Sequence, residues 1–232
     1  MFWFALGVAV GCVLIGAGTL LMVFKLLLES RMEKVISRYA KIYGDEIKAE
    51  RFENADTLIE RYISRLKSMY STDDFKQNNE AYPTMNIKLI YAVIAMCLEL
   101  KEIGLQDPEI ISFSDRAFRK RKKVVAVIGK VANQLPNAFE LAKKWNIGDH
   151  ENRVKDGSIT YDYFTVTDNK VEYKISGCKY VDIFESYGIR GLCKIFCNTD
   201  TQAYSKIPKH VQFIRHSDLS DGDSCWDEII KR

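Results

Sequence analysis

The first apolar feature of the chain is an unbroken run. Residues 2–24 contain no charged side chain, no carboxamide and no histidine. As a helix, this run would extend about 34 Å, enough to cross the hydrocarbon core of a bilayer. A cleaved signal peptide would need a basic start, a shorter apolar core and a small-residue cleavage site, whereas Met1 leads directly into Phe2-Trp3-Phe4. We therefore expect residues 1–29 to be an uncleaved transmembrane anchor.

The residues that flank this run predict its orientation. No basic side chain precedes it, whereas Lys25, Arg31 and Lys34 follow it. The positive-inside rule then places the rest of the chain in the cytoplasm, attached to the cell membrane by a single pass. Cysteines there would stay reduced. Gly7 and Gly11 have the spacing that allows close helix–helix approach, so the anchor could support a homo-oligomer, although ordinary glycine content explains the spacing equally well.

Apolar residues at steps of three and four continue beyond the run. One stripe begins at Met32 and a second runs from Leu58 to Met69. This period is typical of amphipathic helices, so residues 30–82 are interpreted as an amphipathic helical segment. The turn-forming composition of residues 71–83 predicts a loop.

The next segment is nearly all apolar. The sequence from Asn86 to Leu100 predicts a buried helix that ends at Gly104. Asp107-Pro108-Glu109 is typical of a helix start, and that helix is expected to continue to about Gln134. A short helix to Trp145 should follow, before the pattern changes near Gly148.

Alternating apolar and polar residues then predict strands. The expected strands are Ser158–Val166, Lys170–Ser176, Val211–His216 and Cys225–Ile230, with helices over residues 178–206. Residues 83–232 would then form one α+β domain, in which helices precede a small antiparallel sheet of β-β-α-α-β-β order.

Charge excludes one class of function. The formal net charge is +3, and no nucleic-acid-binding signature is present. The densest basic run, residues 116–123, fits either a solvated helix face or contact with anionic lipid headgroups. Membrane lipid is therefore an expected partner, and nucleic acid is not.

Four of the six cysteines lie near the C-terminus: Cys178, Cys193, Cys197 and Cys225. Thiolates are good zinc ligands, but the paired C-x2-C spacing of strong zinc motifs is missing. Buried structural thiols and a pocket with one reactive cysteine are the other interpretations.

Carboxylates accompany these cysteines. Asp200 follows Cys197 by three residues, so the pair could act as proton acceptor and nucleophile. The loop from Asp218 to Cys225 carries three aspartates around Gly222. Its carboxylates could bind a cation or accept a proton from water, or the loop could be a solvated turn.

The same residues carry a family resemblance. Cys178, Gly188, Leu192, Phe196-Cys197-x-x-Asp200, Val211-x-Phe213 and Gly222-Asp223-Ser224-Cys225 occur in that order. The stretch from Tyr91 to Gly104 and Gln106-Asp107-Pro108-Glu109 precede them. Together they resemble the L-2-amino-thiazoline-4-carboxylic acid hydrolase family over roughly residues 85–230. One departure is Trp226, which stands where relatives usually have an acidic residue, with Asp227 next.

The resemblance implies a hydrolase without a cofactor. Its reaction would add water to a small cyclic substrate at the ring carbon between nitrogen and sulfur. It implies catalytic roles for Cys178, Cys197, Asp200, Asp223 and Cys225, and charge alone suggests that Arg215 binds a substrate carboxylate. A distant similarity to 4-vinyl reductase-type domains offers an alternative, which is a tethered small-molecule sensor without catalysis.

Overall fold

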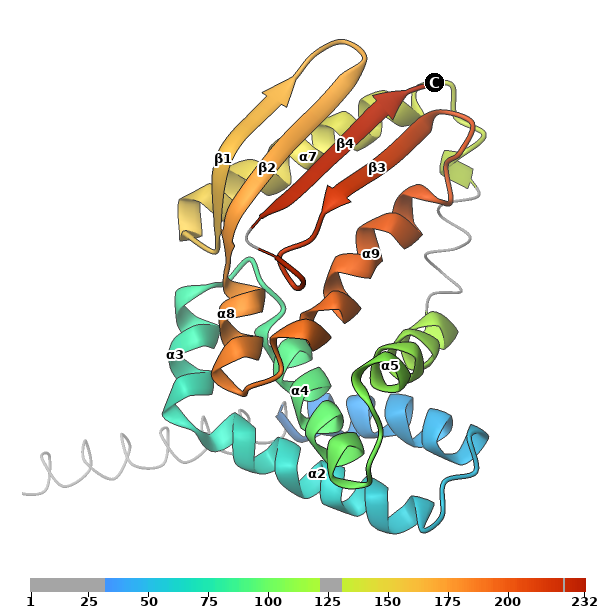
Figure 1. Cartoon of the computed structure of the whole chain (residues 1–232), viewed down its shortest axis with the longest axis vertical. Helices are drawn as coiled ribbons and strands as arrows, with labels where there is room; N and C mark the ends of the chain where they lie inside the picture. Colours follow the sequence, from blue (N-terminus) through green and yellow to red (C-terminus); the bar gives the residue numbers. More distant parts are fainter. Residues whose placement is uncertain (1–31, 122–130, 223) are drawn as a thin grey trace, which may run out of the picture.

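Helices form the first half of the described chain. The computed structural model describes residues 32–121, 131–222 and 224–232 (Figure 1). The helices of this half are a helix over residues 32–49, α2 (Ala55–Ser71), α3 (Asp73–Ala81), α4 (Ile87–Glu102) and α5 (Asp107–Arg121).

The predicted anchor, residues 1–29, lies outside the described residues. No helix within the described part of the chain is both long enough and apolar enough to span a bilayer.

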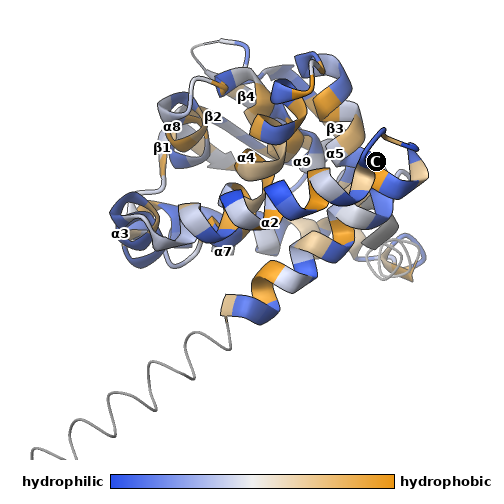
Figure 2. Cartoon of the chain, turned by 90° about the horizontal axis from the view of Figure 1, so that it is seen from below, coloured by the Kyte–Doolittle hydropathy of each residue, from blue (hydrophilic) through white to orange (hydrophobic). Residues whose placement is uncertain are grey.

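The helix α4 is the centre of this half because it is apolar on nearly every side. Ile90, Tyr91, Ile94 and Met96 are fully buried, and α2 packs along α4. Figure 2 shows hydrophilic and hydrophobic residues alternating along α2, as expected for a helix with one face on a core. The predicted buried helix before Gly104 is therefore confirmed.

The prediction of a loop over residues 71–83 was wrong, because α3 occupies most of it. The Thr72 hydroxyl accepts a hydrogen bond from the backbone N–H of Phe75 at 3.2 Å and caps the helix. Asp73 and Asp74 lie in the first turn, where the helix dipole favours carboxylates. Phe75 is buried against Tyr70 and Tyr91. The N-cap at Thr72 and the burial of Phe75 therefore outweigh the poor helix propensity of this segment.

The helix α5 begins at Asp107, as its sequence predicted. Its continuation to Gln134 stays a prediction, because residues 122–130 lie outside the described residues. Arg116, the first residue of the basic run, pairs with Glu46 at 3.1 Å and Glu50 at 2.8 Å. These ion pairs join α5 to the helix over residues 32–49 and to Glu50, the residue directly after it.

A second correction concerns α7 (Ala138–Asp156), which the sequence ended near Trp145. The helix continues through Gly148 and ends at Asp156, followed by the C-cap Gly157, whose φ of +68° suits glycine. The His150 ring stacks on Phe164 of the neighbouring strand, with ring centroids 4.0 Å apart. Packing on the sheet therefore outweighs the cost of a glycine inside the helix.

The second half is built on a four-stranded antiparallel sheet. Its elements are β1 (Ile159–Val166), β2 (Lys170–Cys178), α8 (Lys179–Ser186), the 3-10 turn η1 (Arg190–Cys193), α9 (Lys194–Tyr204), β3 (Val211–Ser217) and β4 (Cys225–Lys231). The strands lie in the order β1-β2-β4-β3. The α+β class and the β-β-α-α-β-β chain order are confirmed.

An irregularity in β1 changes which side chains face inward. Tyr161 pairs with Ile175 and Tyr163 pairs with Lys174, so Asp162 is an extra residue in the ladder. Such a bulge re-aims the residues that follow it. As a result Tyr161 and Phe164, three positions apart, both contact His150 of α7.

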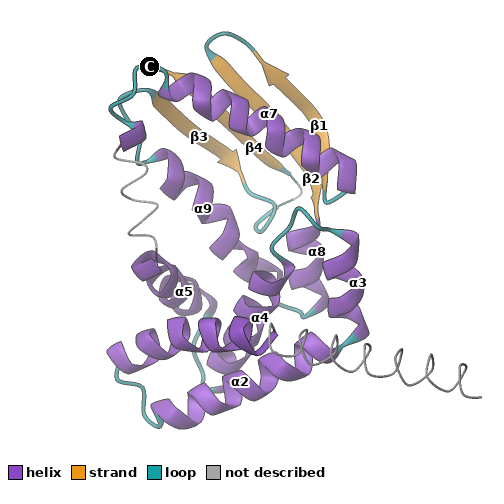
Figure 3. Ribbon diagram, turned by 180° about the vertical axis from the view of Figure 1, so that it is seen from behind, coloured by secondary structure: helices purple, strands orange, loops and turns teal. Residues whose placement is uncertain are grey.

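Two hydrophobic cores result. The larger surrounds α4 and extends to Phe184 of α8 and to Cys225. The smaller lies between α7 and the sheet and includes Phe139, Val171 and Ile229. Figure 3 shows α7 lying across the strands, with α9 beside β3.

Candidate active site

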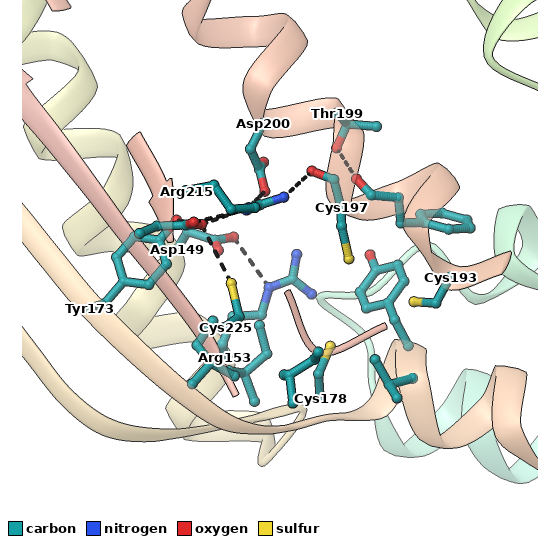
Figure 4. Close-up of a pocket in the computed structure, with 17 residues that line it drawn as sticks. Asp149, Arg153, Tyr173, Cys178, Cys193, Cys197, Thr199, Asp200, Arg215 and Cys225 are labelled. Atoms are coloured by element: carbon teal, nitrogen blue, oxygen red, sulfur yellow. Dashed lines mark hydrogen bonds and ion pairs between the residues drawn. The ribbon is translucent and has the colours of Figure 1, made fainter. Parts of the chain in front are cut away.

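A pocket of about 210 Å³ lies where the two cores meet (Figure 4). Its walls come from α7, β1, β2, the start of α8, η1, α9, β3 and β4. Most of the residues predicted to be functional line it: Cys178, Cys197, Asp200, Arg215 and Cys225. Asp223 lies outside the described residues. Residues distant in sequence thus converge on one pocket.

Cys178 occupies the junction between β2 and α8. It is the last residue of β2 and the N-cap of α8, with extended backbone angles. Burial raises the pKa of its thiol to about 11, although hydrogen bonding to the backbone N–H groups of Val181 and Tyr180 lowers it. A thiolate here would face the positive end of a helix dipole.

Cys193 and Cys197 lie one helical turn apart. Hydrogen bonding with Cys193, together with burial, raises the pKa of the Cys197 thiol far above its usual value. Asp218 contributes a second hydrogen bond to the Cys197 thiol. These contacts hold Cys197 as a protonated thiol. Cys193 also lines the pocket, a role that the resemblance did not assign to it.

Cys225 opens β4 and is 8% exposed. Its thiol donates to Oδ2 of Asp227 at 3.6 Å. Burial, reinforced by the charge of Asp227, raises the pKa of Cys225 well above the usual range.

An ion-pair network forms one wall of the pocket. Arg215 of β3 donates from Nε to Oδ1 of Asp227 at 2.8 Å and from Nη2 to Oδ2 at 2.6 Å. Nη2 also reaches Asp200 at 3.2 Å, and Nη1 donates to the carbonyl oxygen of Cys197. The Tyr173 hydroxyl donates to Asp227 at 3.0 Å. Arg215 is therefore engaged on every side by acceptors of the protein.

Asp200 is the titratable carboxylate of this wall. Half of its side-chain surface is accessible, although Arg215 lies beside it. Desolvation within the pocket, together with the nearby charge of Asp227, raises its pKa to about 6, against the lowering effect of Arg215. A carboxylate with a pKa near 6 can accept and return a proton around neutral pH.

Sequence reasoning missed Asp149 and Arg153, because α7 was expected to end before them. Nε of Arg153 donates to Asp149 at 3.2 Å, four residues earlier on the helix. Nη1 reaches the Thr84 hydroxyl at 3.4 Å. Figure 4 shows the guanidinium group projecting into the pocket beside the sulfur atoms. Its contacts are fewer and longer than those of Arg215.

The acidic loop is held against the pocket. Asp218 accepts hydrogen bonds from the Ser220 backbone N–H at 2.8 Å and hydroxyl at 2.7 Å, and Asp221 pairs with Lys194. Leu219 lines the pocket. No group of three His, Cys, Asp or Glu side chains within the described part of the chain is arranged to hold a metal ion.

Comparison with known proteins adds one match. The family model described as L-2-amino-thiazoline-4-carboxylic acid hydrolase matches residues 87–227. This span runs from the start of α4 to Asp227 and agrees with the resemblance found in the motifs. No curated protein matches the chain.

Proposed function

The chain belongs to the L-2-amino-thiazoline-4-carboxylic acid hydrolase family, and from this membership we propose that it opens a small cyclic substrate by adding water. The carbon attacked would be bonded to both nitrogen and sulfur, as in a cyclic isothiourea. The observation that carries the proposal is the convergence of Cys178 and Asp200 on one pocket, together with a guanidinium group.

Arg153 is the better candidate for holding a substrate carboxylate. Arg215 donates to Asp227, Asp200 and Cys197, so a substrate would have to displace these acceptors. Arg153 lines the same pocket and has one ion pair, with Asp149, besides neutral hydroxyl partners on Thr84 and Tyr180. An arginine presents paired N–H donors that match the two oxygens of a carboxylate.

Cys178 is the proposed nucleophile. Its sulfur adds to the ring carbon, and the thiol proton passes to Asp200. The ring carbon–sulfur bond then breaks, and the departing sulfur takes the proton from Asp200. Water next adds across the carbon–nitrogen double bond of the same carbon. Asp200 accepts one water proton and the nitrogen receives the other. The carbon–sulfur bond to Cys178 then breaks, and the Cys178 thiol is released with the proton from Asp200. The balance is one water consumed, one carbon–nitrogen double bond replaced by a carbon–oxygen double bond, and one substrate thiol released.

The test is direct. The full-length chain is incubated with 2-amino-thiazoline-4-carboxylate, and mass spectrometry follows a product heavier by one water. Cys178→Ser and Asp200→Asn should each lower kcat/KM by far more than about tenfold, or 1.4 kcal/mol. Cys97→Ala, in the core of α4, is the control and should keep its activity. Full activity of both pocket variants would overturn the assignment, and binding without ring opening would support the sensor.

We also propose that residues 1–29 anchor the protein in the cell membrane, with the hydrolase domain cytoplasmic. The uncharged run over residues 2–24 and the basic residues after it support this topology. Membrane lipid would then be a partner of the anchor, and paired anchors could form a homo-oligomer.

A further inference from the structure

A second chamber adjoins the candidate active site. It has a volume of about 300 Å³ and shares a wall with the first, which includes Asp149, Arg153, Tyr173 and Asp200. The inner chamber, at about 210 Å³, is smaller than the roughly 300–1,000 Å³ typical of small-molecule sites. The two chambers together reach that range. The thiols line only the first chamber, which is called the inner chamber, and the second is called the outer chamber.

The outer chamber differs from the inner one in chemistry. Its lining includes Trp145, Tyr161, Phe164, Tyr173 and Tyr204. Its charged residues all lie in the shared wall. Each of those charges is paired. Asp149 pairs with Arg153 at 3.2 Å, and Asp200 pairs at 3.2 Å with Arg215, which lines only the inner chamber.

The fold holds these aromatic rings in place. The bulge at Asp162 turns both Tyr161 and Phe164 inward. Phe164 and Tyr173 stack with an interplanar angle of 15°, and His150 stacks on Phe164. The chamber is therefore built from rings held by their neighbours.

Two of the chamber's hydroxyl groups, those of Tyr204 and Tyr173, are directed to protein partners. The Tyr204 hydroxyl accepts a hydrogen bond from the Asn146 carboxamide at 2.7 Å. The Tyr173 hydroxyl donates to Asp227 at 3.0 Å. A ligand would therefore meet mainly ring faces and edges, which favour flat apolar groups.

We propose that the substrate has two parts, a reactive ring in the inner chamber and a flat apolar arm in the outer one. This inference rests on the proposed function. Arg153 lines both chambers, so a carboxylate bound to it lies at the shared wall. The ring position next to the carboxylate-bearing carbon then points into the aromatic chamber. An unsubstituted ring would leave this chamber without a ligand group.

Two probes and two matched variants test this. Isothermal titration compares 2-amino-thiazoline-4-carboxylate with its 5-phenyl derivative on the full-length chain. The phenyl compound should bind about tenfold more tightly or better, because a buried ring leaves water. Tyr161→Ala should reduce that advantage by about fivefold and change the Kd of the parent compound less than about twofold.

The control variant lies on the same strand. Tyr163→Ala, on the opposite face of β1, where Tyr163 bonds Glu172, should keep the full advantage. Equal affinities for the two probes, no binding of either, or an advantage that survives Tyr161→Ala would overturn the inference.

Ring opening is measured in parallel, so that the two proposals fail separately. If the phenyl compound is preferred but neither probe is opened, the hydrolase proposal fails and the two-part ligand stands. If the parent is opened and the phenyl compound is excluded, the hydrolase proposal stands and the two-part substrate fails.

Discussion

Arg215 and Asp227 face each other across β3 and β4 as register partners, joined by contacts of 2.8 and 2.6 Å. Their side chains are 16% and 1% exposed, so this is a buried two-point ion pair. It fixes the position of Arg215, which in turn holds Asp200 and the carbonyl oxygen of Cys197. The pair therefore positions one wall of the candidate active site.

Removal of one partner should be costly. Asp227→Ala leaves Arg215 buried with Asp200, Asp218 and the Cys197 carbonyl oxygen as its remaining partners. We expect the free energy of unfolding to fall by about 3 kcal/mol, at the lower end of the range for broken buried pairs. Urea denaturation measures this. Asp162→Ala, at an exposed pair with Lys174, should change stability by less than about 0.5 kcal/mol, and equal effects of the two variants would contradict the prediction.

Activity should depend on the ionisation of Asp200. Its pKa is raised from 3.8 to about 6, and only the carboxylate can accept a proton. The kcat/KM for 2-amino-thiazoline-4-carboxylate should therefore rise with pH through about 6. A flat profile between pH 5 and 7, measured at constant ionic strength, would exclude Asp200 as the proton acceptor.

The stability contribution of Asp200 has the opposite sign. Because its folded pKa lies above its unfolded pKa, the contribution is fully present below pH 3.8 and is lost as pH rises through about 6. The stability of the wild type relative to Asp200→Asn should therefore fall across this window. Denaturant titrations at several pH values measure the difference, and a constant difference would contradict the raised pKa.

The cysteines should differ in reactivity. The pKa of Cys178 is about 11, whereas those of Cys97, Cys197 and Cys225 are raised further. Since the thiolate is the reactive form, iodoacetamide should label Cys178 before these three, at a rate rising about tenfold per pH unit below its pKa. Peptide mass spectrometry gives each rate, with Cys97 as internal control. Faster labelling of Cys197 would reverse the assignment of nucleophile.

Arg153 should recognise the substrate carboxylate. Arg153→Gln should raise the KM for 2-amino-thiazoline-4-carboxylate by about tenfold or more, because a charged hydrogen bond is lost. The corresponding carboxamide, as ligand, should bind the two proteins with similar Kd. Lys174→Gln on the other face of the sheet is the control. If Arg215→Gln alone weakens binding, without loss of stability, the carboxylate belongs to Arg215.

Membrane topology can be tested independently. A reporter fused after Arg232 should behave as cytoplasmic, because the basic residues follow the apolar run. A thiol reagent that cannot cross membranes should leave Cys178 unlabelled in intact cells and label it after permeabilisation. Reporter activity on the outer side would overturn both the orientation and the expectation of reduced cysteines.

Much of the fold could be predicted from local pattern. Period-two alternation located the four strands to within a few residues, and the nearly all-apolar segment before Gly104 predicted the central helix. The extent of α7 could not be predicted, because Gly148 and the polar residues after it favour a turn. Tertiary contacts such as the stack of His150 on Phe164 extend the helix.

The candidate site, too, could be predicted where residue type and local pattern suffice, and could not where tertiary contacts decide. Cys178, Cys197 and Cys225 were identified by residue type and motif. Arg153 was not identified, because the helix that carries it was expected to end near Trp145. Asp227 could have been found, since it lies two residues after Cys225 on a predicted strand and so shares its face. That Arg215 is engaged by Asp227 depends on the register of β3 and β4, which local pattern does not specify.

The position of the pocket between two cores has a consequence for folding. A ligand there would contact residues packed on both cores, so its binding requires the two cores to be assembled. At a concentration about 100 times its Kd it would add about 2.7 kcal/mol to global stability. Without ligand, the smaller core around Phe139, Val171 and Ile229 should open independently of the larger one. Amide hydrogen exchange should then be faster in α7 and β1 than in α4. Ligand should slow exchange in these elements together and make the two cores unfold as one.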